Sequence, residues 1–559
     1  MLKNSWHIII LILGILIINL FPSFFLLLGT YFLLDTGFAP FTEFRGFFEV
    51  SIFGHLTHLL SYLLGYALFS KLFFVFVILV GITTGLLISK YIGTTFPQFR
   101  SKTLDIAAII AAVYNPFMYE RLISQTGIAF GSYMLIIGIL IILICRARPC
   151  DATYDYHRIL KYYNLGILSM FPFAVAWMIF PHAILLIVLI LTVLTLMYPK
   201  NIIQFMLILF GVILLNINWL VGDYALRLNT NVSKLESFTR DNIEVFQGNS
   251  LSGLGVDLTH LFGYGFWGEK YHIISPDDIM KYWYIFAILV LTIVVYGGYK
   301  LYIRDKYIAI VLSSIAVIAY ILSMGIASPI WGWSSEILYE YLPFYIGMRE
   351  PQKWLALTQG IYMIYFVIGS MYLLHSKWLN NIQENIFKRL FQYLVKVFIV
   401  VLPILWVPTM LIGFWGQLNI SDYPDDIFEA REFVQTKIPA DSKIINFPWH
   451  SYMACDWTYG KVTANRAKDL YYPANIVTSD NIEIGKLYSN SVASQSIDIN
   501  KFVNNKDINL LIKNRIEYVL FNSSCADWRK YMFLEEDTVH YEKLFDSEHI
   551  KIYKVKNEK

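Results

Sequence analysis

The feature that most constrains this chain is a succession of apolar segments, each close in length to the hydrocarbon core of a bilayer. A helix needs roughly 20 apolar residues to cross that core. We predict eleven transmembrane helices in the chain of 559 residues. They cover about 8–34, 72–90, 104–122, 127–145, 163–180, 182–198, 201–221, 282–300, 306–325, 354–374 and 397–415. The composition agrees, because only 15% of the residues are charged, against about 25% in soluble domains.

Three segments need a separate interpretation. Segment 50–70 is apolar but carries His55 and His58, and we expect a re-entrant or interfacial helix there rather than a twelfth span. The run 8–34 has no clear small-residue cleavage site, so it predicts a retained span instead of a removable signal peptide. Residues 375–396 look amphipathic and predict a connector on the membrane surface, where Lys and Arg meet anionic headgroups.

The distribution of Lys and Arg indicates how the chain is oriented. With a cytoplasmic N-terminus, the inner loops hold most of these cations, including four between residues 146 and 161, and the short outer loops hold few. Cytoplasmic loops of membrane proteins carry this excess. If 50–70 were a full span, every later loop would lie on the opposite side of the membrane, and the excess of Lys and Arg in the inner loops would disappear. We therefore expect a multi-pass protein of the cell membrane with an extracytoplasmic C-terminus.

The composition becomes polar after Trp415. A helix is expected at Asp425–Thr436, and short strands are expected at Lys443–Phe447, Tyr518–Phe521 and Ile550–Val555. We predict a mostly α, polytopic helical membrane protein. It consists of a transmembrane domain (1–417) with about eleven spans and an interfacial or re-entrant helix, followed by an extracytoplasmic soluble α/β domain (418–559).

Cysteine content and net charge exclude some protein classes. Four cysteines in the whole chain exclude a disulfide scaffold. Cys455 and Cys525 share the predicted outer compartment and form either a disulfide or two free buried thiols. The formal net charge of +3 is too small to indicate a nucleic-acid partner.

The first outer loop supplies the candidate catalytic acids. Asp35 directly follows the first span, where a carboxylate near the apolar boundary can act as a general base; Glu43 is the second choice. Arg45 is a candidate for binding a phosphate. The alternative is a solvated loop whose acid ends a helix.

Two further groups are candidates for a cavity. His55 and His58 lie three residues apart, on one helical face, and either hold a metal or phosphate or form an interfacial pair without a metal. Tyr119, Glu120 and Arg121 follow an Asn-Pro pair that interrupts the third span. They form either a belt at the membrane interface with a local ion pair or the wall of an outward-facing cavity.

Two outer loops combine aromatic and charged side chains. Trp267 and Glu269 suit either stacking on sugar faces or anchoring at the headgroups. Arg349 and Lys353 are predicted to lie one turn apart at an outward-facing helix start, where two cations clamp a phosphate. The alternative is an ion pair between Arg349 and Glu350.

Common catalytic fingerprints are absent from the sequence in a supporting context. We find no P-loop, G-x-S-x-G, kinase or Rossmann pattern, so ATP hydrolysis and serine-hydrolase chemistry have no support. No inverted repeat is obvious, which disfavours a secondary transporter.

Several of these features together resemble the GT-C superfamily of membrane glycosyltransferases. They are an acid just after the first span, many spans, an aromatic outer loop and an external C-terminal α/β domain. Four strings resemble a bacterial and archaeal branch similar to the large arabinofuranosyltransferases and to YfhO-like membrane proteins. They are Tyr-Asn-Pro-Phe-Met-Tyr-Glu-Arg-Leu (114–122), Asn-Ile-Asn-Trp-Leu (216–220), Gly-Tyr-Gly-Phe-Trp-Gly (263–268) and Met-Arg-Glu-Pro-Gln-Lys-Trp (348–354).

The resemblance implies a polyprenyl-phosphate-linked sugar donor, an acceptor glycan, lipid or protein, and an active site on the outer face. It implies a catalytic acid in the first outer loop, which here is Asp35 or Glu43. The short loop departs from the family because no acid–aromatic pairing is identified in it. A divalent metal is left unassigned, since the requirement varies across the superfamily. The alternatives are a non-enzymatic translocator of lipid-linked glycans and an envelope-assembly scaffold.

Overall fold

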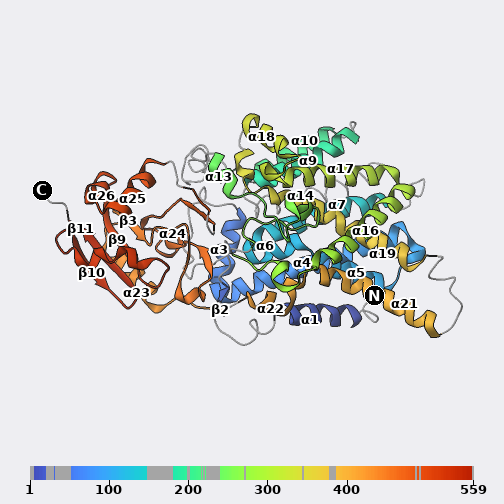
Figure 1. Ribbon diagram of the computed structural model, residues 1–559, viewed down its shortest axis with the longest axis horizontal. Coiled ribbons are helices and arrows are strands. Elements are labelled where there is room, and N and C mark those ends of the chain that lie inside the picture. Colours follow the sequence, from blue (N-terminus) through green and yellow to red (C-terminus); the bar gives the residue numbers. More distant parts are fainter. Residues whose placement is uncertain are drawn as a thin grey trace.

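The computed structural model describes the chain in segments. They are residues 6–20, 30–31, 52–147, 180–197, 202–215, 217, 221, 240–269, 272–342, 345–376, 386–418, 420–484, 487–489 and 493–556. Helices form the larger, N-terminal part, and a sheet flanked by helices forms the C-terminal region at the opposite end (Figure 1).

The longer helices coincide with the apolar runs. They are α1 (Trp6–Leu20), α3 (Ile52–Leu64), α4 (Tyr66–Thr95), α5 (Lys102–Val113), α6 (Pro116–Ser124), α7 (Thr126–Ala147), α9 (Phe180–Met197), α10 (Ile202–Leu215), α16 (Trp283–Arg304), α17 (Lys306–Ser323), α19 (Leu355–Leu374) and α21 (Ile386–Trp406). Every predicted span except 163–180, which lies almost wholly outside the described residues, overlaps one of them, although the boundaries differ.

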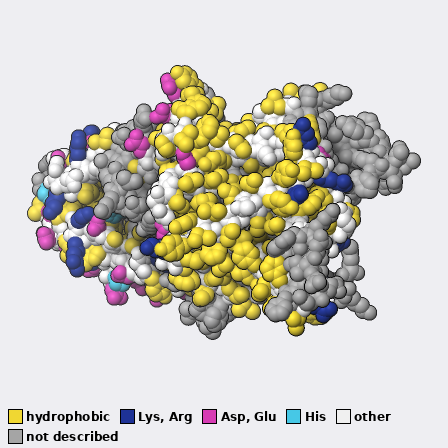
Figure 2. Space-filling model, turned by 45° about the vertical axis from the view of Figure 1, so that its right-hand side comes forward, with side chains coloured by type: hydrophobic (Ala, Val, Ile, Leu, Met, Phe, Trp, Pro, Cys, Tyr) yellow, Lys and Arg dark blue, Asp and Glu magenta, His cyan; other side chains and the backbone are white. Residues whose placement is uncertain are grey.

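Length and apolar composition qualify several of these helices as membrane spans. Among the described residues, five helices are long and apolar enough, or six when the bent pair α5–α6 counts as one span. Shorter apolar stretches lie in α1, α7 and α9. The face in Figure 2 is largely apolar over the helical part, and charged side chains gather towards its two ends. A multi-pass membrane protein is confirmed, and the larger number of spans stays a prediction.

The segment 50–70 divides at Gly65, whose φ of 78° separates α3 from α4. With 13 residues, α3 is too short to cross a bilayer. The 30 residues of α4 extend about 45 Å, beyond the roughly 30 Å hydrocarbon core. At the N-terminal end of α4, Tyr66 donates a hydrogen bond of 3.1 Å to Asp422 in the C-terminal region. A helix distinct from the neighbouring span is thus confirmed, and its interfacial position stays a prediction.

The third span breaks at Asn115-Pro116. The Asn115 side chain caps α6 by accepting a hydrogen bond of 3.0 Å from the Met118 backbone N–H, and Pro116 occupies the first helical position, where its missing N–H costs nothing. The axes of α5 and α6 differ by 47°. The Asn-Pro pair therefore interrupts this span as predicted and gives α6 a direction of its own.

Small residues allow the closest approach between two helices, α16 and α19. A Cβ added at Gly297 would lie 1.8 Å from the Tyr365 carbonyl oxygen, and one at Gly369 would lie 2.2 Å from the Ile293 carbonyl oxygen. Helices in membranes commonly pack through small residues because backbone contact replaces the missing hydrophobic driving force.

The last predicted span, 397–415, has the wrong boundaries. The helix α21 runs from Ile386 to Trp406, so it joins half of the predicted connector 375–396 to the span, and Pro408 prevents its continuation. The following α22 (Leu411–Gly416) is a left-handed turn, with φ between 51° and 63° over residues 412–415. That conformation costs about 1–2 kcal/mol for each non-glycine residue.

The C-terminal region contains a five-stranded sheet in the order β10-β11-β9-β3-β6. Its strands are β3 (Lys443–Phe447), β6 (Asn475–Val477), β9 (Ile516–Asn522), β10 (Tyr541–Asp546) and β11 (Ile550–Val555). β3 is parallel to β6 and β9, whereas β11 is antiparallel to β9 and β10. Two hairpins, β4–β5 (Tyr452–Ala454, Val462–Ala464) and β7–β8 (Ile482–Ile484, Leu487–Ser489), lie beside the sheet. The α/β prediction is confirmed, as are the predicted helix and strands.

Helices cover both faces of this sheet. The helices α23 (Asp425–Lys437) and α24 (Ala467–Leu470) pack on one face. On the other face lie α25 (Ser494–Asn505), α26 (Ile508–Lys513) and α27 (Phe533–Glu536). Thr30–Tyr31 (β1) forms a short antiparallel pair with Ile420–Ser421 (β2) at the start of this region. Because α1 ends at Leu20 and β1 is a strand, the predicted end of the first span at residue 34, directly before Asp35, is wrong.

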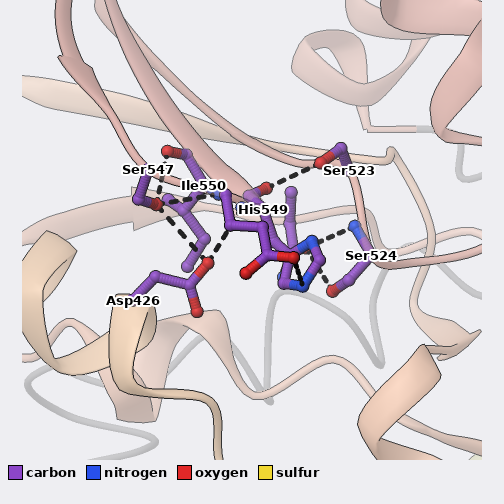
Figure 3. Close-up of polar contacts among 8 residues, drawn as sticks. Asp426, Ser523, Ser524, Ser547, His549 and Ile550 are labelled. Atoms are coloured by element: carbon purple, nitrogen blue, oxygen red, sulfur yellow. Dashed lines mark hydrogen bonds and ion pairs between the residues drawn. The ribbon is translucent and has the colours of Figure 1, made fainter.

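Polar contacts close the sheet against α23 (Figure 3). The carboxylate of Asp426 accepts a hydrogen bond of 2.9 Å from the His549 backbone N–H and one of 3.4 Å from the Ser547 hydroxyl. The His549 carbonyl accepts from the Ser523 N–H at 2.7 Å. Cys455 and Cys525 form a disulfide, which decides between the two alternatives that the sequence left open.

Candidate functional site

Five ionisable side chains meet inside the protein and are called the buried charge cluster. Glu120 and Arg121 come from α6, Glu269 from the loop between α14 (Gly255–Leu261) and α15 (Pro276–Ile279), and Glu350 and Lys353 from the segment just before α19. None is more than 4% exposed. Buried charges are costly unless they are paired, and ionisable residues at membrane depth are functional candidates by default.

Glu350 joins the two cations of the cluster. One carboxylate oxygen lies 3.4 Å from Arg121 Nη1 and the other 3.4 Å from Lys353 Nζ. Arg121 also donates a hydrogen bond of 2.9 Å to the Gln125 side chain, and its guanidinium lies 4.7 Å from the centre of the Phe266 ring. The interior thus holds a cation–anion–cation triad in which Glu350 lies between Arg121 and Lys353.

Glu120 and Glu269 bring two buried carboxyl groups close enough beside this triad for their charges to interact. Two neighbouring carboxyl groups in a dry site do not both ionise, because like charges repel, so one of them keeps its proton. Burial, and then the charge of Glu120, raise the pKa of Glu269 well above its ordinary value, so Glu269 is the protonated partner. Such a pair in a dry site can take up or release a proton.

The other oxygen of Glu120 fixes the aromatic loop. It accepts hydrogen bonds of 3.1 and 3.2 Å from the backbone N–H groups of Gly265 and Phe266. Gly265 has a φ of 120°, and a Cβ there would lie 2.3 Å from the His260 ring, so only glycine fits this conformation. Asn249 donates to three carbonyls of the same loop. The loop is therefore a rigid cover over the cluster.

A second set of contacts connects this loop to the C-terminal region. The Gln417 side chain accepts from the Ile274 backbone N–H at 2.9 Å and donates to the Tyr119 hydroxyl at 3.0 Å. Lys461 in turn donates to the Gln417 carbonyl. The His272 ring stacks on Tyr452 at 6.4 Å, and burial lowers the pKa of His272 to about 4. A displacement of the C-terminal region would therefore be transmitted directly to the loop over the cluster.

The residues predicted from the first outer loop cannot be placed. Asp35, Glu43 and Arg45 lie outside the described residues. His55 and His58 lie on α3 and are partly exposed. Within the described part of the chain, no group of three or more His, Cys, Asp or Glu residues is arranged to hold a metal ion.

The structure places the other predicted residues more deeply than expected. Trp267 is 2% exposed and packs against Phe246 and His272, so neither face of its indole ring lies open to a sugar. Lys353 is 1% exposed and points at Glu350 rather than outward. Arg349 is only partly buried, with its guanidinium 5.0 Å from the Phe246 ring centre.

Sequence reasoning missed the polar residues that hold the site together. Asn249, His272 and Gln417 carry no local pattern, and their partners are distant in the chain. Gln417 did stand at the predicted boundary between the two domains, which was the only signal available for it. The hydroxyl of Tyr119, a predicted cavity residue, contacts the Ile274 carbonyl and the Gln417 side chain, and its part in a binding cavity stays a prediction.

The carboxyl pair predicts how stability depends on pH. Because the pKa of Glu269 is raised in the folded state, the unfolded chain loses this proton first, and stability falls as pH rises above the ordinary glutamate range. Glu269→Gln removes the titrating carboxyl group and should flatten this decline. Thermal unfolding in detergent at pH 5 and pH 8 measures it, with the exposed Glu340→Gln as control. Equal pH dependence in the two variants would contradict the raised pKa of Glu269.

Apolar helices surround the buried charge cluster, and the α/β region packs over one end of these helices. This arrangement defines a polytopic membrane protein whose polar site lies at the end covered by the α/β region. The chain is similar to the arabinofuranosyltransferase AftD from Mycobacteria, with 11% identity over 100% of this chain and a TM-score of 0.55. It spans only 40% of the AftD chain.

Two further solved structures are similar to the chain. The Archaeoglobus fulgidus oligosaccharyltransferase in the apo form has 11% identity and a TM-score of 0.51, over 93% of this chain and 70% of its own. Apo ArnT from Cupriavidus metallidurans has 11% identity and a TM-score of 0.50, over 99% of this chain and 98% of its own. No family model matches the sequence, and no curated protein does. The chain has the fold of the GT-C membrane glycosyltransferases.

Proposed function

We propose that this protein is a membrane glycosyltransferase that moves a sugar from a polyprenyl-phosphate donor to a glycan, lipid or protein acceptor on the outer face of the membrane. The observation that carries the proposal is the GT-C fold over nearly the whole chain, shared with two proteins named as sugar transferases. A fold alone does not fix an activity. The chemistry of the residues proposed for the donor and acceptor sites is the second support for this proposal.

The donor requires a lipid-facing surface next to cationic groups. Apolar helices provide the surface for a prenyl chain, and Arg349 lies partly exposed beside the buried charge cluster. We assign Arg349 and Arg45 to the donor phosphate, because negative charge develops on the departing phosphate and nearby cations stabilise it. Lys353 is held by Glu350 and therefore acts by positioning that carboxylate.

The acceptor hydroxyl requires a base. Asp35 is the proposed catalytic base, with Glu43 as the alternative, and either would remove the hydroxyl proton as the new glycosidic bond forms. The pairing of Thr30–Tyr31 with Ile420–Ser421 supports this proposal, because Tyr31 precedes Asp35 by only four residues in the sequence and is tied to the start of the C-terminal region.

We also propose that residues 1–417 form the transmembrane domain and residues 418–559 an extracytoplasmic domain. The disulfide between Cys455 and Cys525 supports this orientation, since disulfides persist in oxidising compartments. The excess of Lys and Arg in the alternate, inner loops supports it independently.

The test separates transfer from translocation. The full chain is reconstituted in liposomes with a polyprenyl-phosphate sugar labelled in the sugar, together with glycans and lipids extracted from the source membrane. We expect the label to move to an acceptor while free polyprenyl phosphate accumulates. If the intact donor instead changes leaflet with its sugar attached, the protein is a translocator and the proposal is wrong.

A further inference from the structure

A cavity of ≈ 50 Å³ lies in the C-terminal region, apart from the buried charge cluster. Its walls include the carboxyl ends of β3 and β9, the β4–β5 hairpin and the Cys455–Cys525 disulfide. A site for one water needs about 10–15 Å³ on this scale. The cavity therefore has room for about four waters, which matches the edge of one small ring better than a lipid or an oligosaccharide.

The cavity lies where the strand order of the sheet reverses. From β3 the chain passes to β6 on one side, and it then returns to β9 on the other side, both parallel to β3. When the chain leaves two neighbouring parallel strands in opposite directions, a crevice opens beyond the carboxyl ends of these strands. Open α/β sheets bind their ligands at such a switch point.

Asn446 near the end of β3 is the strongest indication that the cavity takes a ligand. It lines the cavity, is 4% exposed, and by strand alternation shares the face of Ile444. Among the described residues its side-chain amide has no hydrogen-bond partner. A buried amide without a partner is unfavourable, and the apolar neighbours Ile427 and Leu470 offer none, so its partner must come from within the cavity, where a polar ligand can replace water.

The rest of the lining indicates the chemistry of that molecule. Tyr423, Trp457 and Tyr471 supply aromatic surface, which packs on the C–H groups of a ring. The nearby cation, Arg466, is paired with Asp469 at 3.4 Å, so the site is not built for a phosphate.

Amide groups match the hydroxyls of such a ring. Asn465 and Asn522 line the cavity with Asn446, and each amide carries two N–H donors and one acceptor oxygen. Part of this capacity is already used. The Asn465 amide donates to the His450 carbonyl at 3.0 Å and accepts from the Ala467 backbone N–H at 3.0 Å, and the Asn522 oxygen accepts from the Ser524 backbone N–H at 3.0 Å. The amide of Asn446 and the N–H donors of Asn522 remain for a ligand. Aromatic surface combined with amide donors suits a neutral ring bearing several hydroxyl groups.

We propose that this cavity binds the edge of a single neutral sugar residue, the terminal unit of the acceptor glycan. The identification of this sugar as part of the acceptor rests on the proposed function, whereas the binding of a sugar in the cavity does not. The β4–β5 hairpin connects the two sites: Met453 and Thr463 line the cavity, while Tyr452 stacks on His272 in the loop over the buried charge cluster. A bound glycan end would therefore be anchored next to the hairpin that contacts the loop over the buried charge cluster.

Binding is measured on the full chain in lipid nanodiscs by saturation-transfer difference NMR. The probes are the methyl pyranosides of glucose, galactose and mannose and the methyl furanoside of arabinose. We expect at least one of them to receive saturation from the wild type. Asn446→Leu should weaken its binding tenfold or more without lowering the thermal midpoint, because an unpaired amide is replaced by an apolar group of similar size. Asn509→Leu, at an exposed position of α26, is the matched control and should bind as the wild type does.

The inference is overturned if no probe binds to the folded wild type, or if Asn446→Leu binds as well as Asn509→Leu does. Its failure differs from that of the proposed function. Asp35→Asn should still bind the glycoside although it no longer cleaves the donor. A wild type that cleaves the donor but binds no glycoside contradicts this inference alone, and the reverse result contradicts only the proposed function.

Discussion

The Glu350→Ala variant is expected to lose roughly 3–5 kcal/mol of stability, the usual cost of removing one partner of a buried ion pair. Glu350 is the carboxylate between Arg121 and Lys353, and both cations are at most 1% exposed. Arginine cannot shed its proton to escape the penalty. The yield of monodisperse protein and the apparent thermal midpoint in detergent measure the effect.

Two further variants show whether charge pairing causes that loss. Glu340→Ala removes an exposed carboxylate from α18 (Gly332–Tyr341) and should leave the midpoint unchanged. A triple variant with Glu350→Leu, Arg121→Met and Lys353→Met should recover much of the stability, because buried ion networks are often replaceable by apolar side chains. A Glu350→Ala protein as stable as Glu340→Ala would show that the triad carries no such energy.

The Asp35→Asn variant is expected to transfer sugar 10²- to 10⁴-fold more slowly, the usual contribution of a general base. Asparagine has nearly the same shape as aspartate but cannot accept the proton of an acceptor hydroxyl. Folding should be unaffected, because the change is isosteric and removes only one charge from an outer loop. Initial rates at saturating donor, compared at equal amounts of folded protein, measure the loss.

Glu43→Gln is the matched control for this prediction. It removes a second carboxylate from the same loop and should retain transfer within a few fold. If Glu43→Gln is inactive and Asp35→Asn is active, the base is Glu43. If both variants are fully active, no acid of this loop is the base.

The helices were predictable because their signal is local. A run of about 20 apolar residues predicts a helix whatever its neighbours, since a bilayer leaves no other way to pair the backbone. The signals for the Asn115-Pro116 break and for the strand Lys443–Phe447 were also local. The boundaries of α21 could not be predicted, because Ile386–Lys396 is amphipathic and its sequence suits both a surface connector and the first turns of a span.

The buried charge cluster was only half predictable. Glu120, Arg121, Glu350 and Lys353 stood out as ionisable residues close to apolar runs. Their partners did not, because Arg121 and Glu350 are 229 residues apart and a single sequence favours the adjacent Arg349 as the partner of Glu350. Three-dimensional packing brings such distant partners together, as it does for the disulfide between Cys455 and Cys525.

Release of free polyprenyl phosphate from a polyprenyl-phosphate sugar tests the proposed transfer most directly, because it reports cleavage of the donor bond whichever acceptor is used. Mass spectrometry of lipids extracted from nanodiscs that contain the full chain detects it. We predict that free polyprenyl phosphate accumulates over many turnovers with the wild type and falls to background with Asp35→Asn. A folded wild type that leaves the donor intact in the presence of source-membrane acceptors would contradict a glycosyltransferase function.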